Sequence, residues 1–191
     1  KTGVSLIEKS KISEGFFPSS FPYKKNVLFA VAKDAPLPEN TRFFQEYIQN
    51  AIVKLIEAAG GRTLVLFTSY DSLRYSWDIA RTQLRSSGIS LLKQGDEDRF
   101  KLLSNFKKIE NSVLFATDSF WEGVDVPGKS LSQVIIVKLP FGVPSDPVFA
   151  ARSQLIKNRG GYPFMELSVP EAVIKFRQGF GRLMRRSDDR G

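Results

Sequence analysis

The chain has 191 residues, 42% of them hydrophobic, which is enough for one globular domain with a buried core. It has neither cysteine nor histidine, so disulfides, thiolate nucleophiles, sulfur metal sites and histidine general bases are excluded. The 28 basic and 20 acidic residues give a net charge of +8, which favours a polyanionic partner such as nucleic acid.

Hydrophobic periodicity divides the chain into a lead-in and one domain. Residues 1–26 have weak periodicity and many turn residues, so we expect an irregular lead-in, followed by a folded domain over 27–191. Apolar, largely β-branched runs predict strands over 27–31, 63–67, 89–92, 113–117 and 134–138. Helical spacing, capping residues and stop glycines predict helices over 41–59, 71–87, 96–107 and 147–157, and a last helix that starts at Pro170.

The first three predicted helices each have an apolar stripe that we expect to be buried. The stripes consist of Phe44, Ile48, Ala51, Leu55 and Ala59 in the first helix, Leu73, Trp77, Ala80 and Leu84 in the second, and Phe100 and Leu103 in the third. Apolar strands that alternate with helices predict an α/β fold with a mostly parallel sheet covered on both faces. Ligands of such sheets bind at the carboxyl ends of the strands.

The two ends of the chain and its hydropathy suggest a soluble piece of a longer protein. The chain begins with Lys-Thr-Gly and no initiator methionine, and residues 188–191 look like the approach to another strand. No apolar run reaches the roughly 18 residues needed to cross a bilayer, and no signal-like segment opens the chain. We therefore expect no membrane partner.

Residues 123–130 match the Walker A pattern, Gly123-x-x-x-x-Gly128-Lys129-Ser130. A phosphate-binding loop of this kind must end on a helix N-terminus. Here a β-branched run follows Ser130 after three residues, and Pro127 removes one N–H donor. We conclude that this segment is not a phosphate-binding P-loop.

The last predicted helix carries two stripes. Val173, Phe176, Phe180 and Leu183 form an apolar one, and Gln178, Arg182 and Arg185 lie on the opposite side. Gly179 and Gly181 each cost about 1 kcal/mol relative to alanine inside a helix, which suggests that a backbone or a ligand approaches closely. The alternative is an ordinary solvated basic helix.

These motifs resemble those of superfamily 2 helicases. Gln178-x-x-Gly181-Arg182-x-x-Arg185 resembles motif VI, and residues 119–128, Ser-Phe-Trp-Glu-Gly-Val-Asp-Val-Pro-Gly, resemble motif V of the DinG/XPD branch. Residues 66–70 are similar to motif IV, and residues 138–141, Lys-Leu-Pro-Phe, follow motif V as in bacterial DinG-like members. The resemblance extends from about residue 20 to residue 191, and the motif V string is its most specific part.

The resemblance implies a RecA-like three-layer α/β/α sandwich, the second motor domain of an ATP-dependent DNA helicase. Its first domain, the partner across the ATP site, would hold the true Walker A loop and the acidic box for Mg²⁺, neither of which matches this chain. Residues 95–98 are acidic, but we interpret them as capping a helix start. The resemblance also implies a monomeric, cytoplasmic, bacterial protein, in which any iron–sulfur cluster would lie outside this chain.

By resemblance, Arg185 would be the arginine finger that reaches the γ-phosphate of ATP. Arg182 would lie beside it, and Gln178 would sense the phosphate or the attacking water. Both guanidinium groups are expected to project from the carboxyl edge of the sheet, where its ligands bind. Which arginine is the finger stays open. Phosphoryl transfer depends on positioning and charge stabilisation, for which a planar, permanently charged guanidinium is suited.

Four further residues are expected to line the nucleotide site. Gly123 and Gly181 would let the backbone approach phosphate, and Asp125 would bind either the ribose or an arginine of motif VI. Glu122 would assist, or pair with a neighbouring cation.

For single-stranded DNA, we expect Thr68, Ser69 and Ser119, just beyond strand ends, to contact phosphates. Trp121 and Phe141 could stack on bases, although Trp121 could equally be a core or domain-interface residue. A non-catalytic RecA-like module that binds nucleic acid or a partner is the competing hypothesis. A fusion with a nuclease is a third.

Overall fold

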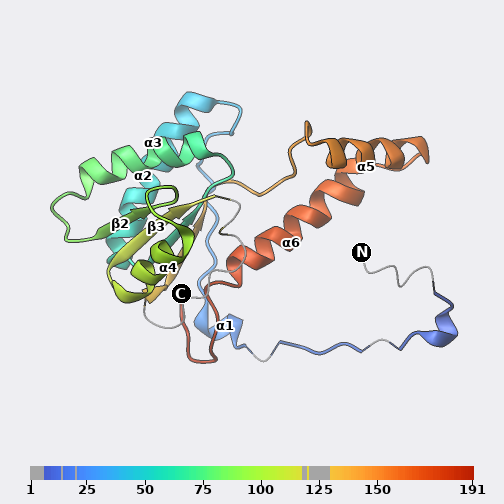
Figure 1. Cartoon of the computed structure of the whole chain (residues 1–191), viewed down its shortest axis with the longest axis horizontal. Helices are drawn as coiled ribbons and strands as arrows, with labels where there is room; N and C mark the ends of the chain where they lie inside the picture. The colour runs from blue at the N-terminus through green and yellow to red at the C-terminus, as the bar shows by residue number, and fades with distance from the viewer. Residues whose placement is uncertain (1–6, 14, 20, 118–119, 121–129) are drawn as a thin grey trace.

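The computed structural model describes residues 7–13, 15–19, 21–117, 120 and 130–191. Within these residues a parallel sheet of four strands has the order β2-β3-β1-β4, and helices lie on both of its faces (Figure 1). The strands are β1 (Thr63–Leu66), β2 (Ser90–Lys93), β3 (Ser112–Ala116) and β4 (Gln133–Ile136). The helices are α1 (Tyr23–Asn26), α2 (Thr41–Ala59), α3 (Tyr70–Gln83), α4 (Arg99–Lys108), α5 (Pro147–Asn158) and α6 (Val169–Phe180), with a 3-10 turn at Lys9–Lys11 and a π-helical turn at Phe164–Ser168. The expected three-layer α/β/α sandwich is confirmed.

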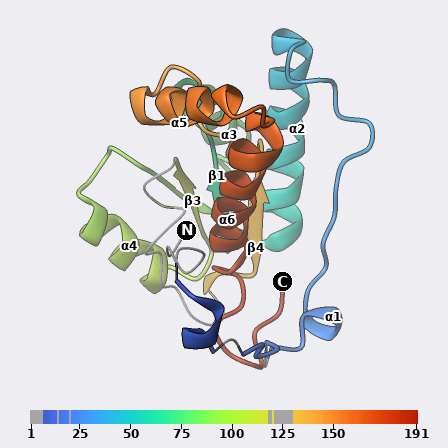
Figure 2. The ribbon, with the colours of Figure 1, turned by 90° about the vertical axis from the view of Figure 1, so that its right-hand side faces the viewer.

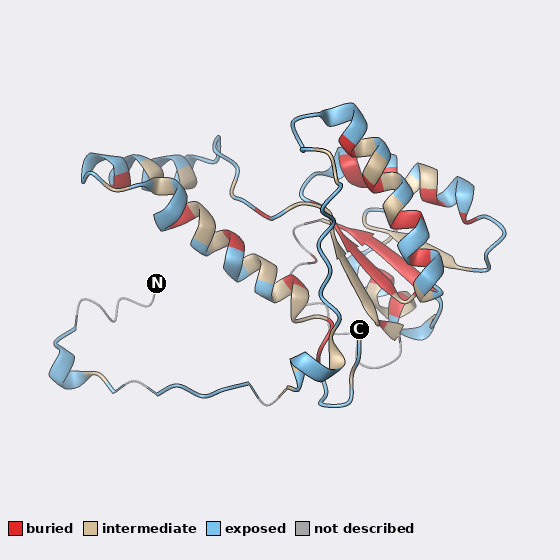
Figure 3. Ribbon diagram, turned by 180° about the vertical axis from the view of Figure 1, so that it is seen from behind, coloured by how far each residue is buried: buried red, intermediate tan, exposed pale blue. Residues whose placement is uncertain are grey.

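The two central strands, β1 and β3, are buried on both faces. Side chains alternate between the faces of a strand, so Val65 and Phe115 pack with α2 and α3, while Leu64 and Leu114 pack with α4. Both strands are fully buried, and β4 at the edge is only half-buried (Figure 3). This double burial explains why these strands read as uninterrupted apolar runs.

The ends of the helices follow their capping residues. The Asp146 side chain accepts a hydrogen bond from the N–H of Phe149 and caps α5, and Asp98 caps α4. Gly60 ends α2 in the left-handed conformation, at φ 63°, which a glycine adopts without steric cost. Four of the five predicted strands and all five predicted helices are present, with ends displaced by a few residues.

Two of the predicted buried stripes are partly wrong. In α2 the buried residues Ile48, Ile52 and Ile56 follow an i, i+4 row, which is inclined to the helix axis, and Leu55 is left 42% exposed. In α4 the helix starts at Arg99, later than expected, so Phe100 falls in its first turn and is 84% exposed. Leu102 and Phe106 are buried in its place, while Leu103 is half-buried.

The predicted strand over 27–31 is also wrong. These residues have no assigned strand, and Leu28 and Val31 are 85% and 72% exposed. A strand requires a paired neighbour, and among the described residues the backbone hydrogen bonds of this segment join it only to Tyr23 and Gly191.

The strand predicted after Ser130 is present as β4, which begins at Gln133. A strand rather than an α-helix therefore follows the Walker A-like segment, which supports our conclusion that it is not a P-loop. Residues 121–129 themselves lie outside the described residues.

Candidate functional site

Polar residues lie at the carboxyl end of β1, as the sequence predicted. Thr68 and Ser69 are exposed and directly precede α3. Ser69 is the N-cap of that helix, and its hydroxyl oxygen accepts a hydrogen bond from the N–H of Ser72 at 3.3 Å. The hydroxyl keeps its own proton to donate. A helix N-terminus with an exposed hydroxyl is suited to contact an anion.

The carboxyl ends of β2 and β3 are joined by a side chain that the sequence analysis missed. The side-chain oxygen Oε1 of Gln94 accepts hydrogen bonds from the backbone N–H of Thr117 at 2.7 Å and from its hydroxyl at 3.0 Å. Gln94 directly follows β2, and this position at the edge of the sheet was the available signal. These bonds hold Thr117, which directly follows β3, against the residue that directly follows β2.

An exposed aromatic cluster lies beyond β4. Phe141 stands 5.7 Å from Phe164 between ring centroids, and Phe164 stands 6.3 Å from Tyr162. The three side chains are 42%, 47% and 64% exposed respectively. Only Phe141 was predicted to take part in binding. Tyr162 and Phe164 come from the segment between α5 and α6, and no sequence pattern indicated that Phe164 would meet Phe141.

The second group of predicted residues lies at the carboxyl end of α6. The helix ends at Phe180, so the prediction that Arg182 and Arg185 lie on a helix is wrong. The N–H of Gly181 donates to the carbonyl oxygen of Arg177 at 2.8 Å, and a side chain at Gly181 would press against that same oxygen. Gly181 therefore accommodates the tight end of its own helix.

The arginines occupy a turn closed by one carboxylate. Asp189 accepts hydrogen bonds from the backbone N–H groups of Arg185 and Arg186, both at 2.7 Å. The guanidinium Nε of Arg182 donates to the carbonyl oxygen of Gln178 at 3.0 Å, which orients that side chain along the helix end. We call residues 181–190 the arginine turn. Sequence reasoning missed Asp189, although an acidic residue four positions after an arginine is a readable signal for such a turn.

Gln178 lies in the last turns of α6 and is half-buried. Its side-chain oxygen Oε1 is buried and has no hydrogen-bond partner among the described residues. A buried acceptor without a partner costs roughly 1–3 kcal/mol, so such an atom calls for an explanation beyond packing.

The arginine turn and the strand-end residues lie at opposite ends of the sheet. Leu183, next to Arg182, lies against Gly191, and Gly191 lies against the carbonyl oxygen of Ser132, which precedes β4. Figure 2 shows α6 running beside the sheet toward the ends where the strands begin. We had expected the guanidinium groups at the carboxyl edge, with the DNA-binding residues, and this expectation is wrong. Because α6 runs back from the carboxyl ends of the strands, its last residues lie at the ends where the strands begin (Figure 2).

Five predicted site residues are outside the described residues. They are Ser119, Trp121, Glu122, Gly123 and Asp125. Their roles stay predictions.

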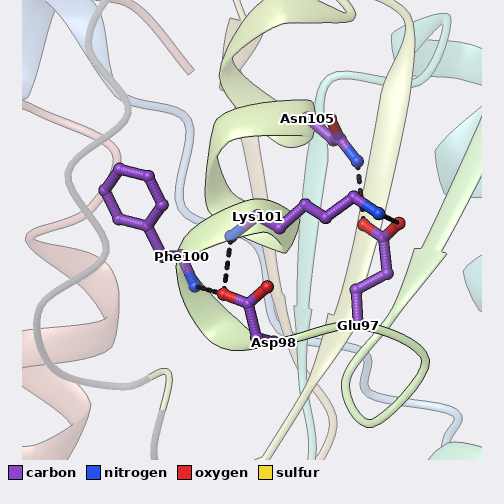
Figure 4. Close-up of polar contacts among 5 residues, drawn as sticks. All are labelled: Glu97, Asp98, Phe100, Lys101 and Asn105. Carbon is purple, nitrogen blue, oxygen red and sulfur yellow. Dashed lines mark hydrogen bonds and ion pairs between the residues drawn. The ribbon is translucent and has the colours of Figure 1, made fainter.

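The acidic residues before α4 cap the helix, as expected (Figure 4). One carboxylate oxygen of Asp98 accepts from the N–H groups of Phe100 and Lys101, both at 3.0 Å. Glu97 pairs with the Lys101 ammonium group at 2.9 Å and accepts from the Asn105 amide at 2.8 Å. The hydrogen bond to the Glu97 carboxylate raises the pKa of the Lys101 ammonium group. In the part of the chain that the structure describes, no three acidic side chains gather as metal ligands.

Comparison with known proteins shows the family to which this α/β domain belongs. Residues 52–191 match the family model described as "Helicase C-terminal domain", and the chain belongs to this family. It is 41% identical to ATP-dependent DNA helicase YoaA of Escherichia coli (strain K12) over 174 residues, which cover 91% of this chain and 27% of that protein. It is 38% identical to 3'-5' exonuclease DinG of Bacillus subtilis (strain 168) over 197 residues, covering 97% and 21% of the two chains. It is 39% identical to ATP-dependent helicase DinG of Mycobacterium tuberculosis (strain ATCC 25618 / H37Rv) over 173 residues, which cover 91% of this chain and 26% of that protein.

These comparisons confirm the predicted resemblance to DinG-like helicases. The chain spans about a quarter of the length of these curated relatives. None of the helices within the described residues has the length and apolar character that crossing a bilayer requires.

Proposed function

We propose that this chain is the second motor domain of an ATP-dependent DNA helicase, and that it supplies an arginine finger to an ATP site whose other half lies in a first domain. The observation that carries the proposal is the arginine turn. In a chain of the helicase C-terminal family, Asp189 holds the backbone at Arg185, and a hydrogen bond to Gln178 orients Arg182.

The arginines would stabilise charge on the transferred phosphoryl group. Arg182 and Arg185 are half-buried, so their charges act in a medium that screens them less than bulk water does. We assign the finger to Arg185 and the neighbouring contact to Arg182. An arginine finger contributes about 10³ to 10⁵ in rate.

The buried Oε1 atom of Gln178 supports a role for this residue in the same site. An acceptor oxygen that finds no partner within the described residues can take a hydrogen bond from the attacking water or from an arginine. We propose that Gln178 orients that water, or senses the phosphate, when the two domains close. Mg²⁺ and most contacts to ATP would belong to the first domain.

Single-stranded DNA would bind across the carboxyl end of the sheet. Thr68 and Ser69 would contact phosphates, with α3 pointing its N-terminus at the strand. Phe141 would stack on bases together with Phe164 and Tyr162, with which it forms one exposed aromatic cluster. These contacts hold the strand without reading its sequence.

The two groups of residues lie at opposite ends of the sheet, so the proposed function assigns each end its own partner. DNA contacts at the strand ends and nucleotide contacts at the end of α6 leave each surface free for its own partner. Closure of the first domain on the arginine turn would then move the DNA-binding end relative to that domain.

A non-catalytic RecA-like module remains the alternative function. The retention of Gln178, Arg182 and Arg185 argues against it, because a module without a nucleotide role has no need for this combination. We further propose that the whole protein acts as a monomer in a bacterial cytoplasm. Any iron–sulfur cluster would lie outside this chain, which has no cysteine.

The proposal is tested by DNA-stimulated ATP hydrolysis with the protein divided into two parts. We expect no hydrolysis by this chain alone and hydrolysis when it is mixed with the first-domain part. Hydrolysis by this chain alone would refute a shared site. So would an inactive mixture under conditions in which the undivided protein is active and the two parts bind each other.

A further inference from the structure

A lysine without an assigned role lies at the carboxyl end of the sheet. Strands β1 and β4 are parallel, with Leu66 level with Ile136. The N–H of Val137 continues this pairing, because it donates to the carbonyl oxygen of Leu66 at 3.1 Å. One residue further along the chain, Lys138 is therefore level with Thr68. Lys138 thus stands at the edge that carries the proposed DNA-binding residues.

The ammonium group of Lys138 is held over an aromatic ring. Its Nζ atom lies 4.7 Å from the ring centroid of Phe44, which belongs to the first turn of α2 and is only 5% exposed. A ring packed in the interior has little room to move, so it provides a fixed surface for the half-buried lysine side chain. An ammonium group on the face of a ring keeps its N–H donors for another partner.

Lys138 differs from Lys93, the lysine at the carboxyl end of β2. Lys93 also lies over a ring, 5.5 Å from that of Trp77, but its ammonium group is paired with Asp96 at 3.1 Å. Within the described residues, no carboxylate forms an ion pair with Lys138. A partly desolvated cation without a counter-ion is more costly than a paired one, so this charge suits an anionic partner.

The cap of α3 belongs to the same end and face of the sheet. The side-chain amide of Gln45, next to Phe44, donates to the hydroxyl of Ser72 at 3.4 Å. The N–H of Ser72 in turn donates to the hydroxyl oxygen of Ser69 at 3.3 Å. These contacts join the start of α2, on which Lys138 rests, to the N-terminus of α3. A cation and a helix N-terminus both attract an anion.

We propose that Lys138 donates a hydrogen bond to a phosphate of single-stranded DNA, and that the ring of Phe44 positions its ammonium group. The inference rests on the proposed function, because it adds a charged contact to the phosphate contacts of Thr68 and Ser69. Cations dominate the affinity for a nucleic acid, since they release the counterions of its phosphates, and hydroxyl groups do not. A contact to phosphate positions the strand without reading its bases.

The test is the salt dependence of single-stranded DNA binding by the full-length protein, measured by fluorescence anisotropy with a labelled oligonucleotide. Lys138→Ala should weaken binding about tenfold. The plot of the logarithm of the binding constant against that of the salt concentration should become shallower by about 0.7, which corresponds to one phosphate contact. Lys138→Arg should restore most of the affinity and of the slope, because it keeps the charge.

Lys54→Ala is the matched control. Lys54 is exposed on the same helix as Phe44, about 15 Å further along its axis and toward the other end of the sheet, so its loss should change neither quantity. If Lys138→Ala binds with unchanged affinity and slope, or resembles Lys54→Ala, the inference is overturned while the proposed function stands. If the unmodified protein binds no single-stranded DNA, both are contradicted.

Phe44→Leu tests the positioning role of the ring. It keeps an apolar side chain in the core and removes the ring face, so it should weaken DNA binding about threefold at an unchanged salt slope. In a Lys138→Ala background, Phe44→Leu should have no further effect on DNA binding, because the ring acts through Lys138 alone. An equal loss in both backgrounds would show that Phe44 does not position Lys138.

Discussion

At the scale of single residues, Asp189 sets the shape of the arginine turn. Its carboxylate holds two successive backbone N–H groups, those of Arg185 and Arg186, while the adjacent Asp188 only pairs with the exposed Arg186 side chain at 3.3 Å. Asp189 would touch neither ATP nor DNA. We therefore regard it as a positioning residue for Arg185.

Asp189→Ala should lower kcat for ATP hydrolysis by about tenfold, which corresponds to about 1.4 kcal/mol of lost transition-state stabilisation. KM for ATP should change much less, because the finger acts mainly in the transition state. Steady-state kinetics of the full-length protein provides the measurement. Asp188→Ala is the control, and an equal loss in both variants would contradict the role of Asp189.

The aromatic cluster leads to a second prediction at this scale. Phe164→Ala should weaken binding of single-stranded DNA by about 1–3 kcal/mol, as loss of one stacking platform does. Phe100→Ala is the matched control, because Phe100 is 84% exposed on α4 and outside the cluster. Fluorescence anisotropy with a labelled oligonucleotide measures both. If the two variants bind equally well, the cluster does not stack on bases.

At the scale of elements, α4 depends on its cap. Asp98→Ala removes the acceptor for two helix N–H groups and should lower the free energy of unfolding by about 1 kcal/mol. Glu97→Ala breaks only an exposed ion pair and a side-chain hydrogen bond, so it should cost roughly half as much or less. Urea denaturation compares the two variants. A larger loss for Glu97→Ala would show that the cap does not fix this helix.

The elements were predictable where local chemistry decides them. The strands β1 and β3 are buried on both faces, and double burial leaves a continuous apolar run that is visible in the sequence. Helix ends followed Asp98, Asp146 and Gly60, whose preferences act within one turn.

Other features depend on contacts between distant segments, and the sequence did not predict them correctly. Residues 27–31 have strand composition, but pairing requires a neighbour that composition cannot supply. Helical spacing predicted that Arg182 and Arg185 continue the last helix. In the structure α6 ends at Phe180, and Asp189 holds the following residues in a turn. Phe164, with Tyr162 beside it, meets Phe141 because the chain folds back after α5.

At the scale of the whole molecule, the proposed function places DNA binding and ATP hydrolysis at opposite ends of the sheet. The exposed hydroxyls and aromatic rings lie where the strands end, and the arginine turn lies where β4 begins. Helix α6 has 12 residues, about 18 Å in length, and links the two ends of the sheet. Under the proposed function, a displacement of the arginine turn would therefore reach the proposed DNA-binding end through one helix.

The central claim is that this chain completes an ATP site with Arg185. The most direct test is DNA-stimulated ATP hydrolysis by the full-length protein carrying Arg185→Ala, with Arg186→Ala as the neighbouring control. We predict that Arg185→Ala lowers kcat by about 10³-fold or more, with DNA binding and thermal unfolding unchanged, and that Arg186→Ala stays close to the unmodified protein. Normal turnover by Arg185→Ala would contradict the account.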